Sequence, residues 1–325
     1  MSSEGRPRAV VTGGAGFIGS HVAHRLIDLG YDMLVVDNLA TGSRSNVPQA
    51  ASFEELEVAG PAIERVLAQW RGEVVVHCAA QVSVATSVVD PALDARSNVL
   101  GTVRTVQAAV AGGCHSFVYV TTGGALYGEP RYLPCDEEHP IEPISPYGLS
   151  KWTGERYLHL LASGSMCRMV LRLANVYGPR QRADGEGGVV SIFAERMRSG
   201  LPVEINGDGQ QTRDFVYVRD VVDAIVAAIN ATRSATVNVA TERAVSVLDL
   251  YSELAAIAGY SKPPVFVAPR PGEVRHSRLA IAKARRELDW SPRTTFEAGL
   301  AETYASMASS VPESQALRGG QVPTE

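Results

Sequence analysis

Residues 8–19 constrain this chain more than any other segment, because a short apolar run breaks there into spaced glycines. Gly13, Gly16 and Gly19 follow one another at three-residue intervals, and a helical pattern extends over 20–29. In such a turn the first glycine allows a sharp bend, the second lets backbone approach a pyrophosphate, and the third lets helix and strand pack closely. The helix N-terminus adds unpaired N–H groups and partial positive charge. The segment predicts a dinucleotide site.

An acidic residue stands 18 positions after Gly19, at the end of a second apolar run over 33–36. The carboxylate of this residue, Asp37, is placed to accept hydrogen bonds from the ribose hydroxyls of an adenine dinucleotide. The same negative charge repels a 2′-phosphate. We therefore expect NAD rather than NADP as the cofactor.

Composition narrows the class of protein. Charged residues make up 20% of the 325 residues and the net charge is −5, which gives no basic field for nucleic acid. No apolar run approaches the length of a membrane span, and the N-terminus leads directly into the first predicted strand without room for a signal peptide. The four cysteines are widely scattered, which indicates thiols in a reducing cytoplasm rather than a metal site.

Apolar runs and helical patterns alternate along most of the chain. The β-branched runs lie at 9–11, 33–36, 74–77, 117–120, 169–173 and 236–239. Helical patterns separate most of them, notably over 91–111 and 147–161. This alternation predicts an α/β fold: a Rossmann-type, doubly wound parallel sheet with helices on both faces.

The rhythm changes after Pro179, where a polar, glycine-rich stretch begins. We expect an NAD-binding domain over 1–178, to which the chain returns near 215–245. A smaller substrate-binding lobe is expected over 179–308. The last stretch, 309–325, is rich in serine, glycine, proline and glutamine and is expected to be disordered.

A tyrosine and a lysine four residues apart provide a candidate catalytic pair. The run 117–122 ends in two threonines, and strand ends face the ligand crevice in sheets of this kind. Further on, Pro146 favours a helix start, so Tyr147 and Lys151 share one helical face. A phenol has a pKa of about 10, and a neighbouring ammonium and a positive nicotinamide ring both favour the phenolate. Tyr147 is therefore predicted to be a base for a sugar or alcohol hydroxyl. Chance also produces such pairs on protein surfaces.

Together these residues resemble the extended short-chain dehydrogenase/reductase family, and within it the NAD-dependent nucleotide-sugar epimerases and dehydratases. The resemblance covers about residues 8–305. Its matching segments are 12–19, 37–38, 77–81, 90–91 with Asn98, 127–128, the Tyr147/Lys151 pair, 171–179 and 213–218. Segments 122–128 and 185–190 are similar to those of the short bacterial UDP-glucose 4-epimerases.

The resemblance implies roles for individual residues. NAD is expected to contact Gly13, Gly16, Phe17, Ile18, Gly19, Asp37, Asn38, Ala79, Ala80, Asn98, Tyr147 and Lys151. The implied catalytic residues are Tyr147 as base, Lys151 as its partner and Thr122 as the hydroxyl that orients the sugar oxygen. Many relatives carry that hydroxyl one residue later, where this chain has Gly123. The implied substrate residues are Thr122, Asn175, Val190, Arg213, Arg275 and Ser277, with the arginines suited to a diphosphate. Surface ion pairs are the alternative for the arginines.

The reaction implied is a 4-epimerisation of a nucleotide-diphosphate sugar, UDP-glucose and UDP-galactose above all, through a 4-keto intermediate. Tyr147 would remove the 4-hydroxyl proton while hydride moves to NAD and later returns to the opposite face. A 4-ketoreductase uses the same residues and stays open, as does a dinucleotide-sensing regulator. A 4,6-dehydratase or a decarboxylase is disfavoured, because residues 123–125 supply no carboxylate.

Three further expectations follow from the resemblance. Ser277 occupies the position where a tyrosine in some epimerases excludes N-acetylated sugars, so UDP-N-acetylglucosamine is expected to fit. The residue at the usual uracil-stacking position is Asn206, which leaves thymidine or another base open. Relatives dimerise through helices equivalent to 91–111 and 147–161, and the apolar spacing here is compatible with a homodimer.

Overall fold

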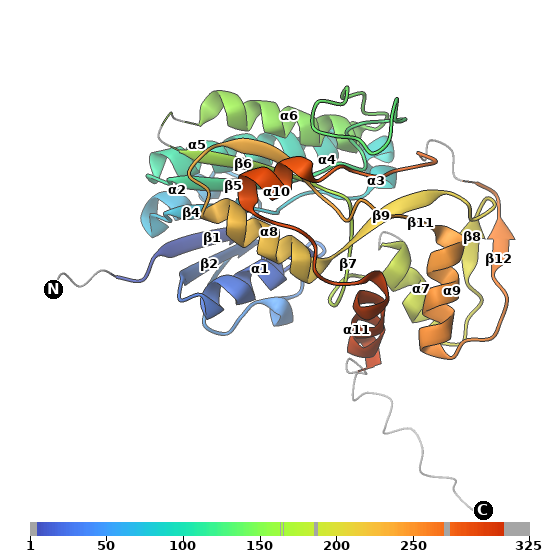
Figure 1. The fold of residues 1–325 in the computed structure, drawn as a ribbon. Coiled ribbons are helices and arrows are strands. Elements are labelled where there is room, and N and C mark those ends of the chain that lie inside the picture. The colour runs from blue at the N-terminus through green and yellow to red at the C-terminus, as the bar shows by residue number, and fades with distance from the viewer. Residues whose placement is uncertain (1–4, 163, 165, 185–187, 270–273, 309–325) are drawn as a thin grey trace, which may run out of the picture.

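The computed structural model describes residues 5–162, 164, 166–184, 188–269 and 274–308. It confirms the predicted α/β fold: a parallel sheet has helices on both faces, and a region of shorter strands and helices adjoins it (Figure 1). The tail expected to be disordered, 309–325, lies outside the described residues.

The central sheet is wound in both directions from its middle. Its strands are β1 (Arg8–Thr12), β2 (Asp32–Asp37), β3 (Ser52–Glu55), β4 (Val74–His77), β5 (Ser116–Thr122), β6 (Cys167–Leu173) and β10 (Ala235–Val239). They lie in the order β10-β6-β5-β4-β1-β2-β3, and every neighbouring pair is parallel. The strand order reverses between β1 and β4, so the ligand crevice is expected outside the carboxyl ends of these strands. The apolar runs predicted all these strands except β3, which lies at the edge with mostly exposed side chains.

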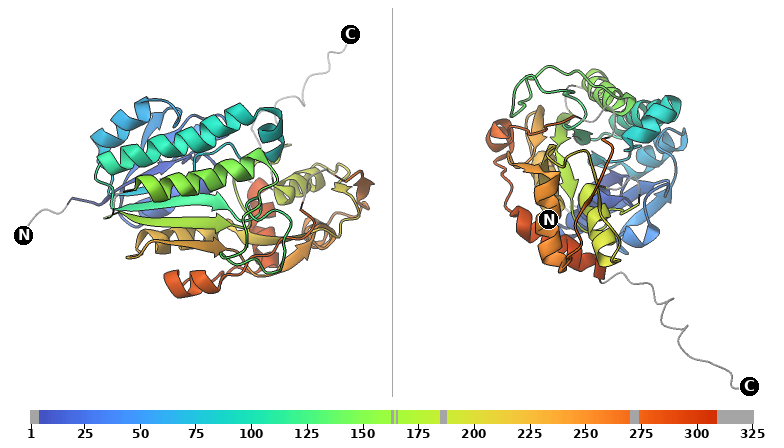
Figure 2. Two further views of the ribbon diagram at one scale, coloured as in Figure 1. Left: turned by 90° about the horizontal axis from the view of Figure 1, so that it is seen from above. Right: turned by 90° about the vertical axis from the view of Figure 1, so that its right-hand side faces the viewer.

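Helices cover the sheet in two layers, each with its own apolar core (Figure 2). One layer contains α1 (Phe17–Asp28), α8 (Val218–Ile229) and α10 (Ala282–Leu288). The other contains α2 (Ala62–Trp70), α5 (Gly101–Ala111) and α6 (Pro146–Leu161). Because aliphatic side chains of the central strands alternate between the two layers, both faces of the sheet are buried.

The helical run predicted over 91–111 is interrupted by a wider turn. It consists of α4 (Pro91–Ala95), a π-helical turn (Arg96–Leu100) and α5. A short helix, α3 (Val84–Val89), precedes it, and a 3₁₀ turn (Arg44–Asn46) follows β2. Single π-turns inside helices occur frequently at functional sites.

The C-terminal lobe has a separate apolar core. It contains a three-stranded sheet of β7 (Asn175–Tyr177), β9 (Thr212–Tyr217) and β11 (Ala244–Ser246), and a parallel pair of β8 (Glu204–Asn206) and β12 (Val265–Val267). Its helices are α7 (Val189–Arg198), α9 (Val247–Ala258) and α11 (Phe296–Ala308). Helix α10 falls within the range expected for this lobe but packs on α8 and β10, because Ala284 and Leu288 enter the core under the main sheet.

Candidate active site

The glycine turn after β1 is closed so tightly that side chains are excluded. Gly13 has a φ of 70° and donates its N–H to Val36 O at 2.8 Å. A methyl group at Gly13 would lie 2.6 Å from Ala79 N, and one at Gly19 would lie 2.2 Å from Gly13 O. Helix α1 begins at Phe17, three residues before the expected start, without a side-chain cap at Gly16 and without an acidic residue in its first turn. This turn therefore offers backbone donors to an anion, as a dinucleotide phosphate requires.

Asp37 ties the end of β2 to the glycine turn. Its Oδ2 accepts the Ala15 N–H at 2.9 Å, and its Oδ1 accepts the Leu39 N–H at 2.8 Å. The next residue, Asn38, donates its amide to Glu57 Oε2 at 2.8 Å. The acid predicted to meet the ribose thus stands beside the glycine turn, and Phe17 and Ile18 form the first turn of α1 next to it.

The segment after β4 is held by a buried asparagine. Asn98 Oδ1 accepts the Gln81 N–H, and Asn98 Nδ2 donates to Gln81 O, both at 2.9 Å. Ala79 N lies 3.4 Å from Thr12 Oγ1. Ala79 and Ala80 thus follow β4, and Ala79 lies beside Gly13 of the glycine turn, while their contact with NAD stays a prediction. Asn98 is almost fully buried and acts on the loop rather than presenting its amide to solvent.

A buried histidine at the end of β4, His77, bridges Thr12 of β1 and Thr102 of α5. His77 Nδ1 lies 2.7 Å from Thr12 Oγ1, and His77 Nε2 lies 3.1 Å from Thr102 Oγ1. Because the Thr102 hydroxyl donates to Asn98 O at 2.6 Å, it accepts from Nε2–H, which sets the neutral tautomer. Burial, and secondarily the charge of Lys151, lowers the His77 pKa to about 3. Sequence reasoning gave His77 no role.

Helix α6 carries the predicted catalytic pair. Ser145 caps the helix by accepting the Gly148 N–H at 3.2 Å, and Pro146 occupies its first turn. Lys151 is buried, with Nζ 4.4 Å from the centre of the Tyr119 ring. Burial lowers the pKa of Lys151 to about 8. Tyr147, one helical turn before Lys151, is partly buried.

The electrostatics of Tyr147 differ from the sequence prediction. We expected neighbouring positive charges to lower the pKa of its phenol. In the structure, burial and then the negative charge of Asp94 raise that pKa. Desolvation of the phenolate and the negative charge of Asp94 therefore both disfavour ionisation of Tyr147.

Thr122 provides the hydroxyl at the end of β5. Its Oγ1 accepts the Ala125 N–H at 3.3 Å. A methyl group at Gly123 would lie 2.4 Å from Leu279 Cδ1, so Leu279 fills the space that a side chain at 123 would need. A methyl group at Gly124 would lie 3.9 Å from both Thr122 Oγ1 and Asn175 Oδ1. Thr122 and Asn175 therefore flank the same glycine.

The remaining predicted substrate residues lie on the lobe. Val190 is in the first turn of α7 with its side chain buried in the lobe core, so it offers a ligand only backbone. Arg213 Nη1 donates to Thr212 O at 2.9 Å and to Arg275 O at 3.3 Å. The Arg275 guanidinium pairs instead with Asp208 at 2.8 Å, on the surface. The two arginines thus have adjacent backbones but separate polar partners.

Ser277 belongs to a segment that passes close to the end of β5, where Thr122 lies. It is mostly buried and donates its N–H to Thr212 O at 3.1 Å. Two residues later, Leu279 contacts Gly123, which adjoins Thr122. The predicted gate position therefore lies on the segment that borders the end of β5.

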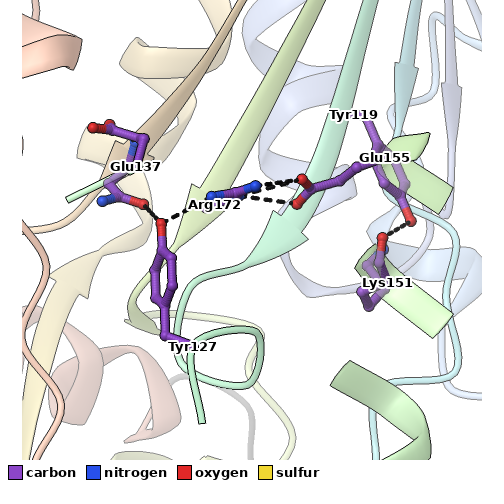
Figure 3. Close-up of polar contacts among 7 residues, drawn as sticks. Tyr119, Tyr127, Glu137, Lys151, Glu155 and Arg172 are labelled. Atoms are coloured by element: carbon purple, nitrogen blue, oxygen red, sulfur yellow. Dashed lines mark hydrogen bonds and ion pairs between the residues drawn. The ribbon is translucent and has the colours of Figure 1, made fainter. Parts of the chain in front are cut away.

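A buried polar network, which sequence reasoning missed, links α6 to the main sheet (Figure 3). Arg172 Nη2 lies 2.8 Å from Glu155 Oε2, and Arg172 Nη1 donates to the Tyr127 hydroxyl at 3.1 Å. Tyr127 in turn donates to Asn238 Oδ1 at 2.8 Å. Because Glu155 is one turn beyond Lys151, the network fixes the catalytic helix to β6 and β10. Arg172 and Tyr127 lie in two of the segments that resemble the family. They are 45 positions apart, and nothing in the sequence around either residue indicates that they are in contact.

The described residues contain no group of three or more histidine, cysteine, aspartate or glutamate side chains arranged to hold a metal ion. Nor does any helix in the described ranges combine the length and apolarity needed to cross a membrane. All four cysteines are free thiols.

Comparison with known proteins shows similarity along nearly the whole chain. The model of the NAD dependent epimerase/dehydratase family matches residues 9–240. A protein of Methanocaldococcus jannaschii named as a putative UDP-glucose 4-epimerase is 41% identical over 292 residues, which cover 90% of this chain and 95% of that protein.

Two solved structures are similar in both sequence and fold. UDP-glucose 4-epimerase of Thermotoga maritima with UDP-glucose has a TM-score of 0.91 and 44% identity, covering 93% of this chain and 99% of that one. UDP-glucose 4-epimerase of Thermus thermophilus with NAD has a TM-score of 0.88 and 38% identity, covering 94% and 100%.

Proposed function

This chain belongs to the NAD-dependent epimerase/dehydratase family, and on that premise we propose that it is a UDP-glucose 4-epimerase that interconverts UDP-glucose and UDP-galactose. The observation that carries the proposal is the position of the Tyr147–Lys151 pair. It lies on the buried face of α6, and the charge of Lys151 acts on His77 and Cys78 at the end of β4, beside the glycine turn. A base, an ammonium and a dinucleotide cradle thus meet at one edge of the sheet.

The cradle fits NAD. The space at Gly13 and Gly19 excludes side chains, and the first turn of α1 contains no acidic residue to repel a pyrophosphate. In this proposal, the glycine turn with Phe17 and Ile18 holds the phosphates, and Asp37 and Asn38 meet the adenosine ribose. Ala79 and Ala80 border the nicotinamide half, with Asn98 as their support. When bound, NAD accepts a hydride from the sugar C4 and returns it.

The chain's own residues handle the proton. The Tyr147 oxygen accepts the proton of the sugar 4-hydroxyl, and Thr122 donates or accepts a hydrogen bond at the same oxygen. The Lys151 ammonium favours the phenolate, which burial disfavours. Lys151 is buried and Tyr147 is partly buried, which limits the access of water to the oxidised sugar.

The lobe supplies the nucleotide site in this proposal. Residues 179–308, together with Asn175 of β7, would hold the UDP group. Asn175 and Arg213 would lie at the diphosphate, and the first turn of α7, at Val190, would offer backbone N–H groups. We assign Arg275 a lesser part, because its guanidinium pairs with Asp208. Ser277 leaves room beside the sugar, so we include UDP-N-acetylglucosamine among the substrates.

We infer that the protein is a homodimer formed through α3, α4 and α6. The large apolar side chains exposed on these helices are Val84, Val88, Val89, Leu93, Leu149, Tyr157 and Leu160, and Leu100 of the π-turn that follows α4 is also exposed. Val89 is 86% and Leu160 72% exposed. Helix α6 packs against both α3 and α4, so these exposed apolar side chains lie on adjoining helices, and exposed apolar groups of this size are typical of a protein interface. The four free thiols and the net charge of −5 support a cytoplasmic enzyme without a nucleic-acid partner.

Turnover of UDP-galactose by the purified protein, read by coupled oxidation of the UDP-glucose formed, tests the proposal. We expect activity without added reductant. We also expect the purified protein to retain NAD, which is detected after the protein is denatured and the cofactor is released. Tyr147→Phe is expected to lower kcat about 10²–10⁴-fold while retaining NAD. Tyr157→Phe, on the exposed side of the same helix, is the matched control and should retain activity. Net NADH consumption without epimerisation would indicate a ketoreductase, and NAD binding without turnover a sensor.

A further inference from the structure

Asp94 is a fully buried carboxylate in α4 beside the catalytic helix. Its Oδ1 accepts hydrogen bonds from Gln81 Nε2 and Asn98 Nδ2, both at 2.9 Å. Its Oδ2 has no hydrogen-bond partner among the described residues. Carboxylates are rarely buried in this way without a full set of partners, because desolvation of the charge costs several kcal/mol.

Through Oδ1, Asp94 stabilises the segment that follows β4. Asn98 binds both main-chain groups of Gln81, and Gln81 Nε2 also donates to Ser83 O at 2.8 Å. The π-helical turn Arg96–Leu100 comes directly after α4 and contains Asn98. Asp94 therefore fixes the two side chains that hold this loop in place.

The charge of Asp94 also acts on the catalytic pair. Helix α4 packs directly against α6. Burial and then the charge of Asp94 raise the pKa of Tyr147. Burial lowers the pKa of Lys151, while Cys78, Glu155 and then Asp94 raise it. These are the directions expected of a negative charge on a helix that packs against α6.

We propose that Asp94 is a positioning residue of this active site, which fixes the loop after β4 through one carboxylate oxygen and holds Lys151 in its ammonium form through the charge of the other. The inference rests on the proposed function, because it assigns Lys151 its part in the reaction. A buried lysine readily loses its proton, and only the ammonium form favours the Tyr147 phenolate.

Other charged or titratable groups on the surrounding elements also face the catalytic pair, and Cys78 and Glu155 raise the pKa of Lys151 more than Asp94 does. Glu155 acts on Lys151 but is ion-paired with Arg172 of β6, and burial raises the pKa of Cys78 to about 12, so its thiol is neutral. The remaining groups are His77 of β4, held neutral by burial, Tyr119 of β5, whose pKa burial raises, the exposed Arg96 of the π-turn, and Arg104 of α5, paired with Glu64. Helix α3 contributes no titratable side chain.

Asp94→Asn isolates the charge. The asparagine oxygen preserves the two hydrogen bonds accepted by Oδ1, while the amide takes the position of the unpaired Oδ2. The chain has only three lysines, Lys151, Lys262 and Lys283, so NMR titration of protein labelled at lysine ¹³Cε resolves each of them, with Lys151→Arg for assignment. We expect Lys151 to titrate near pH 8 in the wild type and at lower pH in Asp94→Asn. An unchanged midpoint overturns the proposal.

The pH profile of kcat gives a second readout that loss of structure alone does not produce. Without the carboxylate, the pKa values of Tyr147 and Lys151 both fall, so the whole bell-shaped profile is expected to move to lower pH. Asp90→Asn, which removes an exposed carboxylate from the cap of α4, is the matched control and should leave the profile in place. A profile in which kcat is lower but the two limbs stay at their wild-type pH values would contradict the proposal.

Two further variants keep the test decisive. Gln81→Ala weakens the loop but keeps the charge, so it should lower NAD retention without moving the Lys151 midpoint. If Asp94→Asn does not fold, Asp94→Ala removes the charge without adding a buried amide, and should both move the midpoint and lower NAD retention. A wild-type protein without epimerase activity would refute the proposed function, whereas the lysine titration would still decide the role of Asp94.

Discussion

The guanidinium of Arg172 and the carboxylate of Glu155 form a buried ion pair, with Nη2 2.8 Å from Oε2, one helical turn beyond Lys151. Breaking such a pair from one side leaves a buried charge without a partner. Arg172→Met is therefore expected to lower the free energy of unfolding by about 3–5 kcal/mol in urea denaturation. The double variant Arg172→Met/Glu155→Met should recover much of this loss. Asp32→Asn removes an exposed pair with Arg8 and should cost less than about 1 kcal/mol; equal losses would contradict the explanation.

Stability is expected to fall in acid because of His77. Its pKa is about 3 in the folded protein against an ordinary value of 6.5, so between these limits the unfolded chain binds a proton that the folded chain does not. The neutral His77 therefore contributes to the free energy of unfolding. This contribution is complete above pH 6.5 and is lost as the pH falls toward 3, at up to about 1.4 kcal/mol per pH unit. His77→Gln should remove this slope from the pH dependence of the unfolding free energy. His115→Gln, at an exposed histidine, should preserve it.

Gly123 and Leu279 are expected to be energetically coupled. Gly123→Ser introduces a side chain where Leu279 Cδ1 now lies, and overpacking of this kind costs about 1–3 kcal/mol. Leu279→Ala leaves a cavity and is expected to lower the free energy of unfolding by about 2–5 kcal/mol. In the double variant the serine occupies part of that cavity, so the combined loss in a double-mutant cycle should be smaller than the sum. Additive losses would show that the two positions do not share space.

The apolar surface of α3, α4 and α6 predicts the oligomeric state. Val89→Asp and Leu160→Asp each place a charge in the proposed interface. By light scattering coupled to size exclusion, we expect the mass to fall from that of two chains to the 34.6 kDa of one. Leu201→Asp changes an equally apolar residue on the lobe and should leave the dimer intact. A wild-type monomer would refute the interface.

Substrate range is predicted to depend on position 277. Ser277→Tyr places a bulky ring beside the sugar site and should lower kcat/KM for UDP-N-acetylglucosamine about tenfold or more relative to UDP-glucose. Activity toward both sugars is compared in one coupled assay with each purified variant. Ser277→Thr, a small change at the same position, serves as the control. Equal effects on both sugars would place Ser277 away from the acetyl group.

Local signals predicted the parts of the fold that depend on local chemistry. The glycine spacing predicted the turn after β1, and the proline after Ser145 predicted the start of α6. The edge strand β3 was missed, since its exposed side chains give no apolar run. Helix α10 packs away from its sequence neighbours, and nothing in its short pattern indicates which core it joins.

The candidate site likewise contains residues that local sequence signals indicate and residues whose role depends on contacts between distant segments. Strand ends and helical spacing pointed to Thr122, Tyr147 and Lys151, and their catalytic roles stay predictions. Asp94 has a detectable signal, its position four residues before Asn98, but burial depends on α4 packing against α6. Arg275 shows the limit of pattern matching, because its guanidinium turns to Asp208 through a contact between distant segments.

Strand β10 completes the main sheet only after the chain has passed through β7, α7, β8, β9 and α8. Until that point is synthesised, β6 has no neighbour on its outer side, and its apolar residues face water together with unpaired backbone groups. A ribosome-bound fragment ending near Tyr177 would thus carry an adhesive strand edge, which favours aggregation until the segment that contains β10 emerges.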